Sequence, residues 1–430
     1  MALRREVVNG VGAREEVVDG VRTTFRLECV RSAFAGVVET VVATFALLVA
    51  VRHFGASSGS KAWLVAGPNM GLMAGPVVVA LFHRTGFTPA IAASLVQWMA
   101  AILFGTAAFA SSEGGYVVLV AAAGAAVAAT VPLMTQVYQD AYPDADRGRL
   151  FSRAFFIRIA ASVGAGALMG RFLDWRPDGH PWLLGGASFC CGASAVLVAR
   201  FPRMMVRGNE GVGRREVGDG MISRTLSGLR FVGTDGVFRR TLISWMFLGI
   251  GNLVMLPLRV ELLARPDSEG VIRTAEEIAL LTAVIPNVAR LSTTLWWGRL
   301  FDRWNFFVLR ALLNFLFAAA ILAFFLGDRM WVLVVGAILY GLANSGGDVV
   351  WSLWVTKVTV PERVADYMAV HTFFTGIRGV LAPVIAYAAM ERFPLAWTAW
   401  GCAIAILVAN VILLPEIVER RAGRSASRGG

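Results

Sequence analysis

The sequence contains twelve runs of about 20 mainly apolar residues, the length that an α-helix needs to cross a bilayer. Backbone groups in lipid must find their hydrogen bonds inside the protein, so only helices and closed barrels cross a membrane. These runs are too long and too continuously apolar for the strands of a barrel. The sequence therefore predicts an all-α integral membrane protein. Its spans are expected at 29–52, 61–82, 88–110, 115–138, 149–173, 181–200, 238–262, 277–299, 305–327, 330–355, 364–390 and 395–415.

The composition and charge agree with a membrane protein and exclude several other classes. Hydrophobic residues make up 57% of the chain and charged residues 16%, against roughly 45–50% and about 25% in soluble domains. The net charge of +11 is carried by basic residues between apolar runs, without the motifs of a nucleic-acid-binding module. The four cysteines form no metal-binding or disulfide pattern. We therefore expect no nucleic acid, no metal and no cofactor.

The distribution of basic residues predicts the topology. Most arginines flank the runs on one side, which by the positive-inside rule is the cytoplasm. Both termini are then cytoplasmic, in a multi-pass protein of a bacterial inner membrane. The predicted organisation is a tail (1–28), a six-helix bundle (29–200), a Gly- and Arg-rich cytoplasmic linker (201–237), a second six-helix bundle (238–415) and a tail (416–430).

Short segments of the first half recur in the second half at offsets of 213 to 219 residues, with 213 for the first and seventh spans, and this indicates an internal repeat. Because each half holds six spans, equivalent helices run in the same direction, as parallel repeats do. The fold is therefore predicted as two pseudo-symmetric six-helix bundles. The matches are Pro68-Asn69 with Pro286-Asn287, Phe82-His83-Arg84 with Phe301-Asp302-Arg303, and Phe155-Phe156 with Phe373-Phe374.

The loop after the eighth span resembles a family signature. Gly298-Arg299-Leu300-Phe301-Asp302-Arg303 is similar to the G-x-x-x-D-R motif of the major facilitator superfamily. The resemblance implies transport by alternating access and a gating role for Gly298, Asp302 and Arg303. It extends to Arg84 in the first copy, where His83 stands in place of the aspartate and weakens the match.

Polar and ionisable residues lie deep inside several spans, where they are costly unless they line a polar cavity or pair with one another. By the repeat, Glu39 corresponds to Asn252, and Arg158 and Arg378 come from equivalent helices. We expect the set to line a transport path between the halves; arginines that only snorkel or fix helix packing are the alternative. The expected path residues are Glu39, Asn69, Arg158, Asn252, Asn287, Arg290, Asp348 and Arg378.

The charges within this set suggest the substrate. Three arginines against two acids leave an excess of positive charge, which favours an anionic or carboxylated solute. Glu39, Asp348 or His371 could carry a coupling proton, although His371 could equally be a histidine at the membrane end without a special role.

The leading hypothesis is a secondary active transporter of a small anionic or carboxylated solute, with proton coupling. One alternative is an efflux pump for lipophilic compounds or lipids. Another is a signalling or assembly protein that keeps the fold without transport. An enzyme is not expected, since no catalytic constellation is present. The expected partners are the lipid bilayer, the solute and a co-transported proton, and the chain is expected to be monomeric.

Overall fold

A computed structural model describes residues 2–202, 230–266, 272–359 and 364–426, and within these ranges the regular structure is entirely helical. The all-α class is therefore confirmed. Twelve long helical segments follow one another, three of them extended by short π- or 3-10-helical turns. They are α1 (Ala2–Thr40), η1 (Val41–Phe45) and α2 (Ala46–Arg52), α3 (Ser58–Arg84), α4 (Pro89–Ala107), α5 (Glu113–Ala141), α6 (Asp144–Trp175), α7 (His180–Ala199), α9 (Gly236–Ala264), α10 (Ala275–Ala279), η2 (Leu280–Val284) and α11 (Ile285–Arg303), α12 (Phe306–Leu326), α13 (Met330–Leu353) and η3 (Trp354–Lys357), α14 (Val364–Arg392) and α15 (Leu395–Ala426).

The helices match the predicted spans, and eleven of them in the described ranges are long and apolar enough to cross a membrane. The remaining long helix, α3, has 27 residues and covers the predicted span at 61–82. Large apolar side chains such as Leu168, Phe189 and Leu295 are exposed on the outside, as expected of a surface that faces lipid. Helices α1 and α15 also run on into the charged ends of the chain, since a helix does not have to stop at the membrane boundary.

The two halves repeat the same packing. In the first half α1 packs on α6, α3 on α5 and α4 on α7; in the second half α9 packs on α14, α11 on α13 and α12 on α15. The prolines of the sequence repeat take equivalent places, because Pro68 lies against Gly124 of α5 and Pro286 lies against Gly341 of α13. The structure thus confirms two related six-helix bundles. Most of the predicted linker falls at 203–229, outside the described residues.

Glycines allow the closest helix contacts. A Cβ added to Gly71 of α3 would lie 2.0 Å from the carbonyl oxygen of Ala125 on α5, and one added to Gly67 would lie 2.5 Å from that of Ala121. Helices in lipid associate largely through such van der Waals packing of small residues. The α3–α5 pair therefore depends on these two positions.

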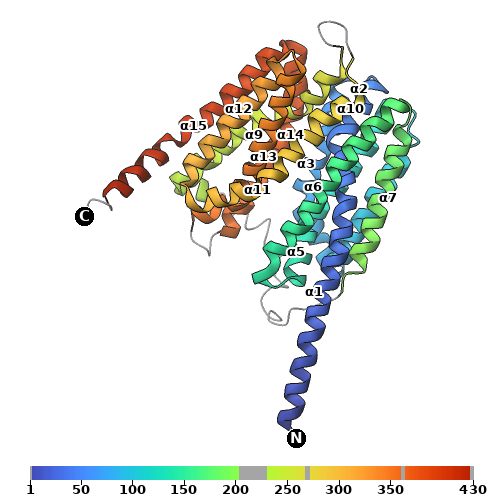
Figure 1. Cartoon of the computed structure of the whole chain (residues 1–430), viewed down its shortest axis with the longest axis vertical. Coiled ribbons are helices and arrows are strands. Elements are labelled where there is room, and N and C mark those ends of the chain that lie inside the picture. The colour runs from blue at the N-terminus through green and yellow to red at the C-terminus, as the bar shows by residue number, and fades with distance from the viewer. Residues whose placement is uncertain (1, 203–229, 267–271, 360–363, 427–430) are drawn as a thin grey trace.

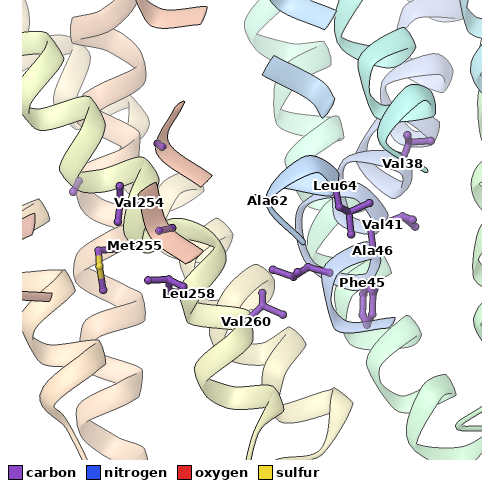
Figure 2. Close-up of a cluster of buried hydrophobic side chains, with 14 of the residues drawn as sticks. Val38, Val41, Phe45, Ala46, Ala62, Leu64, Val254, Met255, Leu258 and Val260 are labelled. Carbon is purple, nitrogen blue, oxygen red and sulfur yellow. The ribbon is translucent and has the colours of Figure 1, made fainter. Parts of the chain in front are cut away.

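The halves lie side by side and lean together at the end away from the chain termini, where α2 and α10 are found (Figure 1). Contacts between them join α3 to α14, α6 to α10, η2 and α11, and α2 to α9. One continuous apolar core includes side chains of both halves. Figure 2 shows part of it, with Val254, Met255, Leu258 and Val260 of α9 beside Val38, Val41, Phe45, Ala46, Ala62 and Leu64 of the first half.

Candidate functional site

Two ion pairs at mid-helix depth form the centre of the candidate site. In the first half Arg158 of α6 donates to Glu39 of α1, with Arg158 Nε 2.6 Å from Glu39 Oε2. In the second half Arg290 of α11 donates twice to Asp348 of α13, with Nε 2.7 Å and Nη2 2.6 Å from Oδ2. The Asp348 side chain is 47% exposed and that of Arg290 is 16% exposed. The carboxylate is thus the more accessible partner of that pair.

Phe155 connects these two ion pairs across the boundary between the halves. Its ring centroid is 6.0 Å from Cζ of Arg158 and 5.2 Å from Cζ of Arg290. Phe155 and Arg158 are three residues apart on α6 and so share a helix face, while Arg290 reaches the ring from α11. Four predicted path residues thus form one charged cluster around an aromatic ring that the sequence analysis did not select.

The local backbone brings α1 and α6 unusually close beside this cluster. A Cβ on Gly36 would lie 2.2 Å from the carbonyl oxygen of Arg158. Thr40 Oγ1 hydrogen-bonds the carbonyl oxygens of Gly36 and Ser162, at 3.0 Å and 3.1 Å. The π-helical turn η1 begins at the next residue, and such turns occur often at functional sites.

The second π-helical turn faces the first one across the halves. Thr44 of η1 and Thr282 of η2 approach to 3.4 Å between their hydroxyl oxygens. The interface between the bundles therefore carries irregular helix on both of its sides, between the charged cluster and the end of the molecule away from the termini.

The remaining asparagines of the predicted path do not join the charged cluster. Asn69 of α3 packs against Gly379 of α14, where an added Cβ would lie 2.3 Å from the Asn69 side-chain oxygen. Asn252 lines a small cavity inside the second half together with Arg259 and Tyr340. Asn287 is half-buried on α11, three residues before Arg290.

The structure places Arg378 and His371 away from the boundary between the halves. Arg378 is 6% exposed, and its Nη1 donates to the carbonyl oxygen of Trp245 at 2.5 Å. Gly249 makes room for its guanidinium against α9. His371 is 1% exposed and packs among three tryptophan rings. The guanidinium of Arg378 is therefore held against α9 of its own half and not beside Glu39.

The loop that resembles the family signature lies at the end of α11 nearer the termini. Asp302 and Arg303 are exposed there, while the adjacent Phe301 is buried with Lys357 Nζ 5.1 Å from its ring centroid. Helix α3 ends at Arg84, whose side chain lies outside the described set. In the part of the chain that is described, no three His, Cys, Asp or Glu side chains gather as metal ligands would.

Sequence reasoning missed the polar contacts that close the opposite end of the interface. Lys61 of α3 and Glu261 of α9 form a buried ion pair between the halves, at 2.7 Å. Asp174 of α6 accepts hydrogen bonds from the backbone N–H groups of Ala275 and Glu276, at 2.6 Å and 2.8 Å, and so caps α10. The only early signal was a charged residue at a span end among apolar neighbours, as in Val260-Glu261-Leu262.

Comparison with known proteins agrees with this fold. The family model described as Major Facilitator Superfamily matches residues 273–430. A mutant of the nucleoside transporter NupG superposes with a TM-score of 0.74 at 13% identity, covering 91% of this chain and 99% of that one. The D-xylose-proton symporter superposes with a TM-score of 0.69 at 14% identity, covering 91% of this chain and 97% of that one.

A bacterial homologue of the human lysosomal transporter Spinster, inward-facing and unoccupied, gives a TM-score of 0.58 at 16% identity, covering 93% of this chain and 95% of that one. None of the curated proteins matches the sequence. At these identities the likeness establishes the fold alone.

Proposed function

We propose that this chain, which has the fold of the Major Facilitator Superfamily and whose second half matches that superfamily by sequence, is a secondary active transporter. It moves a small anionic or carboxylated solute by alternating access, together with a proton. The structural neighbours support the transport of small polar molecules, since their names include a nucleoside transporter and a D-xylose-proton symporter.

The observation that carries the proposal is the facing arrangement of the two arginine–carboxylate pairs. In each pair a guanidinium already holds a carboxylate, which is the group that an anionic solute would present. A solute carboxylate can therefore replace Asp348 on Arg290 with little change in geometry. Before binding, the charges of Arg290 and Asp348 cancel. Once the solute takes the place of Asp348, the displaced Asp348 carboxylate would be an uncompensated charge at membrane depth.

Protonation of the displaced Asp348 removes that charge. Binding of one solute carboxylate is then linked to uptake of one proton, and for a monoanion the complex carries no added net charge. Glu39 and Arg158 can act in the same way in the first half, and Phe155 holds both arginines beside the shared boundary.

The proposed orientation assigns the open and closed ends. With both termini in the cytoplasm, Lys61–Glu261 and the Asp174 cap close the outer end. Transport then requires that these contacts break while contacts form at the cytoplasmic end.

The experiment is a thermal-shift screen of the purified protein against simple mono- and dicarboxylates, followed by counterflow in proteoliposomes with the best ligand. Arg290→Ala should reduce binding about 10- to 100-fold, because a charge-assisted bidentate contact is lost. Arg290→Lys should restore binding only in part, since lysine lacks the planar guanidinium group that holds a carboxylate with two hydrogen bonds. Asp348→Asn should bind the anion without proton uptake, as followed by a pH-sensitive dye.

Arg149→Gln serves as the matched control, because Arg149 forms an exposed ion pair with Asp146 on α6, outside the charged cluster. It should bind and transport like the unmodified protein. Normal binding by Arg290→Ala, or stabilisation by lipophilic compounds and by no carboxylate, would reject the anionic solute.

A further inference from the structure

Two buried arginines lie near the same tryptophan ring inside the second half, apart from the charged cluster described above. Arg310 of α12 is 1% exposed and Arg378 of α14 is 6% exposed. Both lie against Trp245 of α9: Cζ of Arg310 is 3.4 Å from the centroid of its ring and Cζ of Arg378 is 6.0 Å from it. Two like charges near one aromatic ring in a buried environment repel one another.

Neither arginine forms an ion pair with a carboxylate of the described residues, and several donors around them are unsatisfied. Arg378 donates to the Trp245 carbonyl, but its Nε has no acceptor, and neither has either terminal nitrogen of Arg310. A buried donor without a partner costs about 1–3 kcal/mol, and more if it is charged. The unsatisfied set also includes Trp245 Nε1, Trp354 Nε1 and both ring nitrogens of His371.

The internal repeat explains why this charge lacks a counter-charge. Arg158 and Arg378 come from equivalent helices, and each packs on a glycine of the partner helix: the Arg158 carbonyl oxygen on Gly36, and the Arg378 guanidinium on Gly249. In the first half Glu39 neutralises Arg158. The residue that corresponds to Glu39 in the second half is Asn252, which has no charge. The charge of Arg378 therefore has no counterpart to Glu39 among the described residues.

We propose that Arg310 and Arg378 bind a monatomic anion of the size of chloride, inside the second bundle and separate from the solute. Two guanidinium groups near one ring, with unsatisfied N–H donors, supply the charge and the hydrogen bonds that such an ion needs. Arg310, Arg378 and His371 are each more than nine-tenths buried, so the surroundings admit a single ion in preference to an organic acid. The ion stabilises the packing of α9, α12 and α14, and this role does not depend on the proposed transport.

The first test measures thermal unfolding of the purified protein in sodium chloride and in sodium gluconate of equal ionic strength. Chloride at 200 mM should raise the Tm by about 3 °C, since a ligand that binds only the folded state stabilises it. Arg310→Met and Arg378→Met should each lose this difference, even where their Tm in gluconate changes. Acetate should act like gluconate; an effect of acetate equal to that of chloride would contradict the site's restriction to a single ion.

Arg259→Met is the matched control. Arg259 is also buried in the second half, and its Cζ lies 3.6 Å from the ring centroid of Tyr340, with Nε and Nη1 unsatisfied. It contacts Phe324 and Tyr340, and it lies about four turns along α9 from Trp245, roughly 21 Å away along the helix axis. This variant should keep the full chloride effect. If it loses the effect while Arg310→Met keeps it, the site is assigned to the wrong arginines.

A second measurement covers the case in which the arginine variants do not fold. Crystals of the unmodified protein grown in bromide should show an anomalous peak between the side chains of Arg310 and Arg378. Absence of this peak, together with equal Tm values in chloride and gluconate, would overturn the proposal.

Discussion

Lys61 and Glu261 form an ion pair across the two halves of the chain, with Lys61 Nζ 2.7 Å from Glu261 Oε1 and both side chains buried. The two partners are not equally supported. Glu261 also accepts from Arg265, one turn along α9, with Arg265 Nε 2.9 Å from the same oxygen. Lys61 otherwise has the Tyr387 ring 5.2 Å away. Any state that opens this end must separate the pair. Separation leaves Lys61 without a carboxylate, whereas Glu261 keeps its contact with Arg265.

This asymmetry predicts unequal effects of the two single substitutions. Glu261→Gln leaves the buried Lys61 ammonium without a carboxylate and should destabilise the protein by about 3–5 kcal/mol. Lys61→Met should destabilise it less, because Arg265 still neutralises Glu261. Thermal unfolding in detergent measures the order of the two effects.

The double variant Lys61→Met/Glu261→Met checks the explanation, because replacing both charges by apolar groups is often neutral for a buried pair. It should be more stable than Glu261→Gln alone. A double variant as unstable as the sum of the single changes would mean that the pair itself contributes little.

The contact between the two π-helical turns predicts a cross-link. The hydroxyl oxygens of Thr44 and Thr282 are 3.4 Å apart, which places a pair of cysteines within reach of a disulfide. Thr44→Cys/Thr282→Cys should form a disulfide under mild oxidation, hold the far end closed and stop transport, and a reductant should restore it. The assay needs a background in which the native thiols are replaced, namely Cys29, Cys190, Cys191 and Cys402.

Each single cysteine variant should be insensitive to oxidant. Full transport by the cross-linked protein would show that the halves do not separate at η1 and η2.

The close packing of α3 on α5 predicts that Gly71 does not tolerate a side chain. Gly71→Ala places a Cβ 2.0 Å from the backbone oxygen of Ala125, and overpacking of this kind costs about 1–3 kcal/mol. Gly59→Ala is the control in the same helix, since nothing lies within 4 Å of an added Cβ there. It should be neutral or stabilising, because alanine favours helix over glycine. The unfolding temperature of Gly71→Ala should therefore be lower than that of Gly59→Ala.

The position of Phe155 between Arg158 and Arg290 predicts a larger effect on transport than on folding. Phe155→Leu keeps an apolar side chain but removes the aromatic face, which is worth about 0.5–2 kcal/mol for each cation. The kcat/KM for the identified solute should fall about 3- to 30-fold, while the protein still folds, with a Tm lowered by about 2–4 °C for each kcal/mol of lost cation–π contact. Phe156→Leu, at the neighbouring exposed position, should behave like the unmodified protein. Equal losses of kcat/KM in both variants would contradict a role for the Phe155 ring between the two arginines.

The sequence by itself determined the class and the architecture. Apolar runs of bilayer length leave the backbone few alternatives to helix, so the twelve long helical segments of the described ranges were predictable from periodicity and length. The repeat of Pro68 and Pro286 predicted matching helix pairs, because homologous halves pack through the same small residues. The ion-pair members Glu39, Arg158, Arg290 and Asp348 were identifiable because a charge inside a lipid span is rarely without a role.

Only the tertiary structure decided how these charges are paired. A charged residue in a span indicates that a partner exists, but the partner comes from another helix whose rotation and depth the sequence does not state. For this reason Glu39 and Arg158 were found as candidates yet not as a pair, and Arg378 was expected beside them. Packing instead directs Arg378 past Gly249 to Trp245, and places the unexpected pair Lys61–Glu261 across the interface.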